Sequence, residues 1–332
     1  MNILFSPFIY MFFLIARTLI VISSSSIFRI WLGLELNILS FIPIIGFSNE
    51  TKKAREASIK YFLIQSIASS IILFSRIWFL LYGRSSLIII LTRLINLSLS
   101  VKLGLAPFHG WFPEVIEGLS WVNCLIMMTW QKISPIVALS LFFNYEIVVS
   151  LALISALTGA ILGLNQASTR KILAFSSISH IGWIMSIISM NSSLWINYLL
   201  IYFSVSFITC VSFWYFDLNF LSQLFFLEDL PVKILVFINL LSTGGIPPLL
   251  GFLAKIYGFM VVSHSYPILI VLIFSSLITL FFYTRVCLSC FTISQNRSLV
   301  WDLSLKKSKI ILNSVFLIIS SFRLLPVCIF IF

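Results

Sequence analysis

TGGIPPLLGFLAK, residues 243–255, is an apolar stretch that glycine and proline interrupt and that ends in a lysine. KLGLAPFHGWFP, residues 102–113, is a second such stretch and begins with a lysine. Proline lacks a backbone N–H and frees a carbonyl of the preceding turn, so each stretch predicts a broken helix. Inside a membrane, free backbone groups are tolerated only where they face a cavity or other protein. The two stretches therefore predict two discontinuous helices beside an internal cavity.

The composition of the chain is that of an integral membrane protein. Of its 332 residues, 60% are hydrophobic and only 9% are charged, and the mean hydropathy is +1.12. A soluble domain carries about 25% charged residues. Helices are the expected elements because lipid cannot satisfy open backbone groups and the apolar runs are too long for barrel strands. We therefore expect an all-α polytopic membrane protein in which residues 1–332 form one domain.

The apolar runs predict about eleven membrane-spanning helices, since one span needs about 20 apolar residues. They lie near residues 3–22, 28–47, 57–82, 86–105, 121–143, 147–165, 172–190, 194–216, 232–260, 266–292 and 309–331. The fourth run carries an interruption at Pro107, and the ninth at Pro247 and Pro248. Their placement gives the two broken helices opposite directions, which is typical of inverted-repeat transporters. We expect two inverted five-helix repeats, about 1–145 and 146–293, each with a discontinuous helix, and a C-terminal helix at 309–331.

The basic residues predict the orientation of the chain. Its net charge of +11 could suggest a nucleic-acid partner, but these residues cluster in short connections, as membrane topology signals do. We therefore exclude nucleic acid. If the spans alternate, the side with the N-terminus receives Lys52, Lys53, Arg55, Arg170, Lys171, Lys233, Arg297, Lys306, Lys307 and Lys309. The opposite side receives little beyond Arg29 and Arg84. We expect the N-terminus in the cytoplasm or matrix and the C-terminus on the other side.

Among the ionisable residues inside predicted spans, four are candidates for function, namely Glu35, Lys102, Lys132 and Lys255. A charge at membrane depth costs roughly 2.5–3.5 kcal/mol even on lenient scales, so such residues indicate function. Burial disfavours a charged lysine and a nearby carboxylate favours it, so a lysine held between these effects can release and rebind a proton. We interpret Glu35 as the partner of Lys102. The alternative is that the lysines reach the membrane surface along their aliphatic stems or, for Lys255, cap a helix end.

Two histidines, His109 and His180, lie on apolar segments. Imidazole relays protons near neutral pH, although a buried histidine with satisfied hydrogen bonds is an equally good reading. Cys287 and Cys290 form a CxxC within a predicted span, where they are interpreted as small apolar residues. No dinucleotide-binding, P-loop or hydrolase motif is present. We expect no cofactor, no metal and no redox centre in this chain.

Two further features have no firm interpretation from the sequence. Arg17, Arg76 and Arg93 lie inside or near spans, and arginine keeps its charge and makes a poor proton relay. Residues 217–230, DLNFLSQLFFLEDL, form either a short amphipathic helix on the basic side or an ordinary linker.

Six motifs, taken in order, resemble the antiporter-like membrane subunits of mitochondrial respiratory complex I. They are WLGLELNILSFIP (31–43), EASIKYFLIQSIAS (56–69), KLGLAPFHGWFPEVIEGL (102–119), TWQKISP (129–135), GLNQASTRKILAFSSISHIGW (163–183) and GGIPPLLGFLAK (244–255). The number of spans resembles the shortened animal form. The resemblance implies proton translocation across the mitochondrial inner membrane, coupled to NADH oxidation and ubiquinone reduction in other subunits. It places NADH, FMN, iron–sulfur clusters and ubiquinone in those subunits, and implies other membrane-arm subunits, antiporter-like neighbours and membrane lipids as partners.

The resemblance also implies roles for single residues. The four residues of the implied proton relay are Glu35 in GLELN, Lys102 before the first break, Lys132 in TWQK and Lys255 after GFL. His109 and His180 fall on motif positions as possible relays. One position departs from the family, which often has proline before the distal lysine where this chain has Ala254.

Three functions fit these features. The first is a proton-pumping subunit of the complex, and the second is a stand-alone cation/proton antiporter of related fold. The third is a purely structural subunit, in which single lysine substitutions would alter assembly without changing the number of protons moved.

Overall fold

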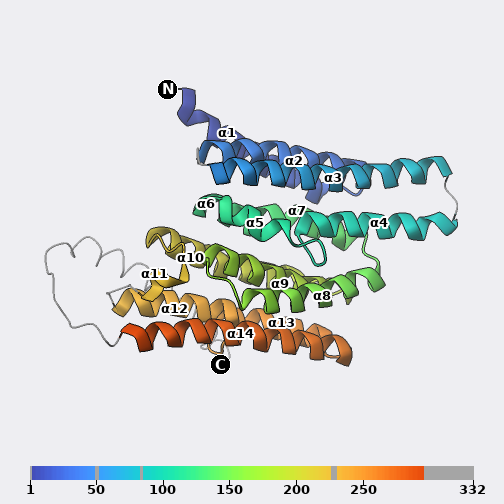
Figure 1. Cartoon of the computed structure of the whole chain (residues 1–332). Coiled ribbons are helices and arrows are strands. Elements are labelled where there is room, and N and C mark those ends of the chain that lie inside the picture. The colour runs from blue at the N-terminus through green and yellow to red at the C-terminus, as the bar shows by residue number, and fades with distance from the viewer. Residues whose placement is uncertain (1, 49–51, 83–84, 226–229, 295–332) are drawn as a thin grey trace.

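A computed structural model describes residues 2–48, 52–82, 85–225 and 230–294, and every regular element in these ranges is a helix (Figure 1). The helices are α1 (Asn2–Ser23), α2 (Ile27–Ser48), α3 (Lys52–Tyr82), α4 (Ser85–Leu103), α5 (Trp111–Gly118), α6 (Trp121–Met128), α7 (Trp130–Leu141), α8 (Tyr145–Gly163), α9 (Thr169–Ser189), α10 (Trp195–Tyr215), α11 (Leu221–Phe225), α12 (Leu230–Gly244), α13 (Leu250–Val262) and α14 (Tyr266–Ser294). The predicted all-α class is confirmed.

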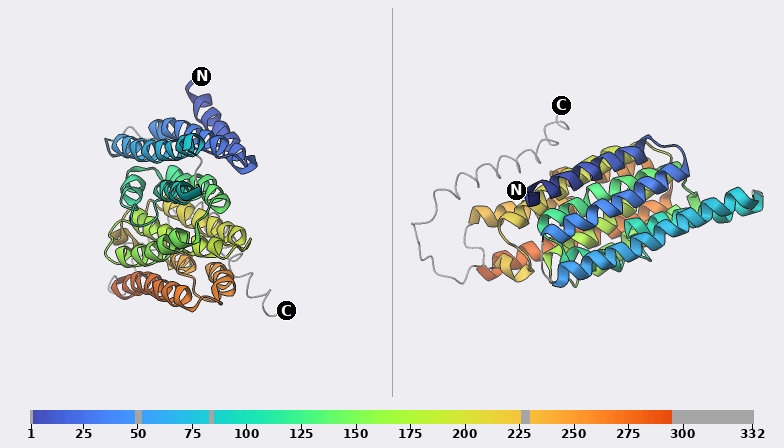
Figure 2. Two further views of the ribbon diagram at one scale, coloured as in Figure 1. Left: turned by 90° about the vertical axis from the view of Figure 1, so that its right-hand side faces the viewer. Right: turned by 90° about the horizontal axis from the view of Figure 1, so that it is seen from above.

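The helices form a bundle in which the chain advances from one side to the other. In Figure 1, α1, α2 and α3 lie at the top and α12, α13 and α14 at the bottom, with α4 to α10 between them. The end-on view of Figure 2 shows the same order as successive layers of helices. The most central helix is α9, whose membrane-length window is 100% buried. A helix that is apolar and buried on all sides is typical of the interior of a large bundle.

Seven helical segments in the described ranges are long and apolar enough to cross a membrane. They are Ile27–Phe47, Lys52–Leu81, Trp121–Leu141, Tyr145–Gly163, Thr169–Ser189, Trp195–Tyr215 and Tyr266–Cys290. Three shorter apolar helices, Phe8–Ser23, Val232–Gly244 and Leu250–Val262, accompany them. The chain is therefore a multi-pass membrane protein. The number of spans and the division into two repeats stay predictions.

Each predicted span up to residue 292 overlaps a helix, but two of them differ in detail. The predicted span 86–105 is only the first part of a broken element, because the short helix α5 follows it. The predicted span 121–143 divides at Thr129 into α6 and α7. The Thr129 hydroxyl donates to the Leu125 carbonyl over 2.7 Å, a back-bond that bends helices. The predicted helix 309–331 lies outside the described residues.

The first break begins with a glycine cap at the end of α4. Gly104 has a φ of +70°, a left-handed conformation that glycine adopts without a steric penalty. Its N–H donates to Val101 O over 3.1 Å, and the N–H of Leu105 donates to Ser100 O over 3.0 Å. This pair of hydrogen bonds defines a Schellman motif, which ends the helix and turns the chain. The predicted break near Pro107 is thus a capped helix end.

The second break repeats this cap at the end of α12. Gly245 has a φ of +76°, and its N–H donates to Ser242 O over 3.1 Å. The N–H of Ile246 donates to Leu241 O over 3.3 Å, which completes the same motif. In both breaks a proline follows within three residues of the glycine, at Pro107 and at Pro247. The last carbonyls of α4 and α12 are left for other partners.

Two apolar clusters pack the bundle, and along several helices they meet at a set of polar side chains. On α9, Ile178 belongs to one cluster and Ile181 to the other. On α6 and α7, Met128 belongs to the first and Ile136 to the second. We call the side chains at this boundary the polar layer, and they are Glu35, Asn37, Gln65, Lys102, Gln131, Lys132, His180, Thr243 and Lys255.

Candidate functional site

The polar layer is held on seven helices and lies mostly out of solvent. The lysines are buried, with exposed fractions of 6% for Lys102, 3% for Lys132 and 5% for Lys255. His180 is 8% exposed. Buried charges and polar groups are stable only when they are paired or hydrogen-bonded, so the partners of each side chain indicate what the layer can do.

Lys132 projects from α7 into a site formed by two aromatic rings and a hydroxyl. Its Nζ lies 4.9 Å from the centre of the Phe112 ring and 5.2 Å from that of Tyr202. It also donates a hydrogen bond to the Tyr202 hydroxyl over 3.3 Å. An ammonium group is attracted to aromatic faces at these distances, most strongly where water is excluded. Lys132 is therefore stabilised without a direct carboxylate partner among the described residues.

His180 lies between Lys132 and the second break. Its Nδ1 is 2.9 Å from the Tyr198 hydroxyl, and its Nε2 is 3.3 Å from the Thr243 carbonyl oxygen. The centre of its ring is 5.1 Å from the ring of Tyr202. A carbonyl can only accept, so Nε2 donates to Thr243 and Nδ1 accepts from Tyr198 when the ring is neutral. The second break supplies the acceptor because Thr243 lies in the last turn of α12.

Lys255 uses the neighbouring free carbonyl of the same helix end. Its Nζ donates to the Gly244 carbonyl oxygen. The aliphatic stem of Lys255 passes over Gly245, where an added Cβ would lie 2.8 Å from the lysine Cε. The carbonyl that is left free at the end of the broken helix therefore contacts a lysine.

Lys102 and Glu35 lie on the other side of Lys132, and each has a charged atom that is buried without a hydrogen bond to the described part of the chain. Neither the Lys102 Nζ nor the Glu35 Oε2 has a hydrogen-bond partner among the described residues. They form no direct ion pair there, but the Glu35 carboxylate is near enough to attract the Lys102 ammonium electrostatically. Buried polar atoms of this kind are usually satisfied by water.

A small cavity connects Lys102 with Lys132. It measures about 20 Å³ of space open to the centre of a water molecule, which is room for about one water. Its lining includes Asn37 and Gln131, whose side chains are joined by a 2.9 Å hydrogen bond. The Asn37 Oδ1 and the Gln131 Nε2 are buried without partners, so both are available to a water in this cavity. A second cavity, also of about 20 Å³, is lined by Tyr202, His180 and Thr243 among others.

Comparisons with known proteins agree with this architecture. The family described as NADH:quinone oxidoreductase/Mrp antiporter, transmembrane, matches residues 24–280. NADH-ubiquinone oxidoreductase chain 2 of Anopheles gambiae is 42% identical over 302 residues, covering 87% of each chain. The chain belongs to the NADH-ubiquinone oxidoreductase chain 2 family. The resemblance seen in the six sequence motifs is thereby confirmed.

Two solved structures share the fold of this chain. A chain of respiratory complex I from Thermus thermophilus has a TM-score of 0.81 at 21% identity, covering 97% of this chain and 78% of that one. A chain of the Mrp complex from Dietzia sp. DQ12-45-1b has a TM-score of 0.74 at 18% identity, covering 82% of this chain and 58% of that one. At these identities the likeness concerns the fold alone.

The structure joins some of the predicted site residues and separates others. Lys132, His180 and Lys255 are linked through aromatic side chains and the end of α12, and Lys102 shares a cavity with Lys132. His109 lies in the first break, and the centre of its ring is 6.5 Å from the centre of the Phe175 ring. Its Nδ1 has no hydrogen-bond partner among the described residues. Among the described residues, no hydrogen bond or ring contact connects His109 with Lys102, Lys132 or Lys255.

Sequence reasoning missed the neutral members of the site. Tyr198 and Tyr202 lie one turn apart on α10, and both contact His180. Their spacing of four residues places them on one helix face, which was the available signal. Gln131, next to Lys132, was also overlooked, although it bonds Asn37 across the first cavity.

The structure also accounts for cations that the sequence left unexplained. Arg17 donates to the Leu36 carbonyl, Arg93 pairs with Glu146 at 3.1 Å, and Arg76 lies over the Phe79 ring. Lys233, which the sequence assigned to the side of the N-terminus, is buried, and its side of the membrane stays a prediction. Lys233 belongs to α12, is 1% exposed, and donates to the Cys290 carbonyl over 3.4 Å.

The remaining predicted elements are simple to place. Residues 217–230 include the short helix α11, Leu221–Phe225, which favours the helix over the linker, the two alternatives that the sequence left open. Cys287 and Cys290 are buried on α14. Within the described ranges, no group of three or more His, Cys, Asp or Glu side chains could hold a metal ion.

Proposed function

We propose that this chain, a membrane subunit of NADH-ubiquinone oxidoreductase, moves protons across the membrane along the polar layer. The observation that carries the proposal is the series of contacts from Lys132 through Tyr202 to His180, whose Nε2 contacts the Thr243 carbonyl next to the Gly244 carbonyl that accepts from Lys255. The series runs through the buried interior, where a charge has no other evident use. Glu35 and Lys102 lie next to it, across the first cavity.

Each side chain in this series can take up a proton and pass it on. An ammonium group donates, a tyrosine hydroxyl both donates and accepts, and a neutral imidazole does both through its two nitrogens. A water in the second cavity would bridge the Tyr202 hydroxyl and His180, which line it together. The carbonyls of Thr243 and Gly244 fix His180 and Lys255 in place by accepting from them, and a proton would pass between these two side chains through water.

The driving step in this proposal is electrostatic. Redox energy released in other subunits would change the separation of Glu35 and Lys102, and so change the proton affinity of Lys102 and then of Lys132. Moving one charge against 100 mV requires roughly 2.3 kcal/mol. One pKa unit corresponds to about 1.36 kcal/mol, so a swing of about two units in a carrier is sufficient.

The location and partners of the chain follow from the same proposal. Its relatives, which are NADH-ubiquinone oxidoreductase chain 2 proteins, support a place in the mitochondrial inner membrane. The basic connections support an N-terminus on the matrix side with the C-terminus on the intermembrane side. Neighbours would be other membrane-arm subunits, including antiporter-like ones, and lipids. NADH, FMN, iron–sulfur clusters and ubiquinone would be bound by those other subunits. The capped breaks at Gly104 and Gly245 support inverted repeats near 1–145 and 146–293.

The substitution Lys132→Ala tests the path. We expect it to lower the number of protons translocated per NADH oxidised by the purified complex in liposomes, because the central carrier is removed. Lys53→Ala, which changes an exposed lysine, serves as the control and should leave the ratio unchanged. An unaltered ratio in Lys132→Ala, with the complex fully assembled, would refute the path.

A stand-alone cation/proton antiporter is the second candidate, since the fold is shared with a chain of the Mrp complex. Purified chain in liposomes would then exchange Na⁺ or K⁺ for protons without any other subunit. A purely structural role would instead appear as impaired assembly in lysine variants whose assembled complexes keep the normal proton ratio.

A further inference from the structure

The short helix α5, the second part of the first broken helix, has two faces with different partners. Its buried face carries Trp111, Phe112, Val115 and Ile116, while Glu114 is exposed and Glu117 half-buried. An isolated helix of eight residues is not stable in water, so packing and side-chain ties decide where α5 sits. What holds its acidic face therefore also decides the position of its aromatic face.

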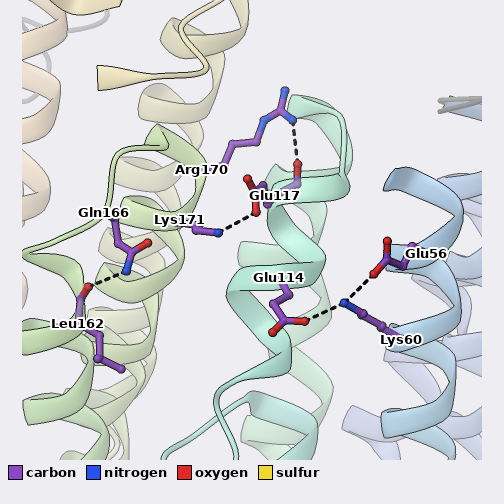
Figure 3. A network of polar contacts seen from close by, with 8 residues as sticks. All are labelled: Glu56, Lys60, Glu114, Glu117, Leu162, Gln166, Arg170 and Lys171. Carbon is purple, nitrogen blue, oxygen red and sulfur yellow. Dashed lines mark hydrogen bonds and ion pairs between the residues drawn. The ribbon is translucent and has the colours of Figure 1, made fainter. Parts of the chain in front are cut away.

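The acidic face of α5 is tied to two different helices (Figure 3). Glu114 pairs with Lys60 of α3 at 2.9 Å, and Lys60 also pairs with Glu56 at 2.9 Å. One turn further along α5, Glu117 pairs with Lys171 of α9 at 2.8 Å. The two carboxylates thus connect α5 with a helix of the first predicted repeat and a helix of the second.

Contacts of the α5 backbone add to the ion pairs with α3 and α9. Arg170, the neighbour of Lys171, donates to the Glu117 carbonyl over 3.2 Å and to Asn219 over 2.8 Å. On the other side, Gly118 lies so close to α3 that an added Cβ would be 2.7 Å from the Lys53 carbonyl oxygen. The end of α5 is therefore held between α3 and α9, in line with the packing of α5 against both helices.

The aromatic face of α5 meets the proton path directly. The Phe112 ring lies under the Lys132 ammonium at 4.9 Å and packs against Gly104, where an added Cβ would lie 3.1 Å from the Phe112 Cβ. Trp111 donates to the Val101 carbonyl over 3.1 Å, which ties α5 to the capped end of α4. A shift of α5 would therefore move the ring that stabilises the charge of Lys132.

We propose that Glu114 and Glu117 are positioning residues that hold α5 between the two halves of the chain and so set the distance from the Phe112 ring to the Lys132 ammonium. The inference rests on the proposed function, because it acts through the proton carrier Lys132. An exposed ion pair by itself contributes little stability. Two such pairs on successive turns of one short helix instead fix its orientation, and a small misplacement near a reacting group changes rates strongly.

The double substitution Glu114→Gln with Glu117→Gln tests this inference in the assembled complex. We expect the rate of proton translocation to fall roughly three- to tenfold and the pH of half-maximal translocation to shift, while the complex stays assembled. The same double change in a Phe112→Leu background should have little further effect, since residues that act through one contact are not additive. Exchanging the partners, as Glu117→Lys with Lys171→Glu, should restore much of the rate lost in Glu117→Lys alone.

Glu146→Gln is the matched control, because it breaks the exposed Arg93–Glu146 pair between α4 and α8 and does not touch α5. It should leave the rate and its pH profile unchanged. Normal translocation in the double glutamine variant would overturn the inference, and so would full additivity with Phe112→Leu. Lys132→Ala separates the two proposals. If it lowers the proton ratio and the glutamine variant does not, the path stands and only the positioning role fails.

Discussion

At the scale of single residues, the site combines charged side chains that can be recognised in the sequence with neutral side chains that cannot. A lysine in an apolar run is conspicuous because its charge is costly at that depth. A tyrosine there is ordinary, since its ring is apolar and only its hydroxyl needs a partner. Tyr202 nevertheless provides the contact that joins Lys132 to the His180 ring. The chemistry of the path therefore depends on residues with no distinctive sequence signal.

Tyr202→Phe isolates the role of that hydroxyl. The substitution keeps the ring under Lys132 and removes the acceptor of the 3.3 Å hydrogen bond. We expect proton translocation to slow by about tenfold or more, since a positioned proton-transfer group contributes roughly 10²–10⁴-fold. Tyr145→Phe, at a tyrosine that is 50% exposed, is the control. Equal rates in both variants of the reconstituted complex would remove Tyr202 from the path.

At the scale of elements, the two broken helices share one mechanism of interruption. Gly104 and Gly245 both adopt a positive φ and close a Schellman motif, and the freed carbonyls accept hydrogen bonds from side chains. Around the second break the acceptors serve His180 and Lys255. The caps thus give the path fixed hydrogen-bond acceptors inside the membrane.

Gly245→Ala tests the cap of the second break. A non-glycine residue in the left-handed conformation costs about 1–2 kcal/mol, and the new Cβ would also press on Lys255, 2.8 Å away from its Cε. We expect a lower temperature of thermal dissociation of this subunit from the solubilised complex. Gly46→Ala, in α2 with no atom within 4 Å of the added Cβ, should leave that temperature unchanged. A midpoint unaffected by Gly245→Ala would mean that the break tolerates a side chain.

At the scale of the whole molecule, the proposed function places the proton path in a polar layer between two apolar clusters, without a wide pore. Its cavities near Lys102 and His180 are each large enough for about one water. Apolar packing on both sides of the layer would prevent an open leak across the membrane. Movement of protons then requires changes in charge within the layer, as the proposed function demands.

The orientation of the molecule can be tested by cysteine labelling. Lys53→Cys and His264→Cys place thiols at exposed positions, at the beginning of α3 and in the connection between α13 and α14. With the basic side in the matrix, a membrane-impermeant maleimide should label residue 53 only in inside-out vesicles and residue 264 only in right-side-out ones. Labelling of both residues from one side would contradict the alternation of the spans.

The sequence by itself determined the membrane class, the helices, both breaks and the four ionisable residues. These follow from hydropathy, from the lack of an N–H in proline and from the cost of burying charge, all of which act locally along the chain. Tertiary structure alone decided which of these residues meet. It joined Lys132 to His180 through Tyr202, left His109 apart and buried Lys233 in α12. Such contacts depend on how distant helices pack against each other, and no local pattern records that packing.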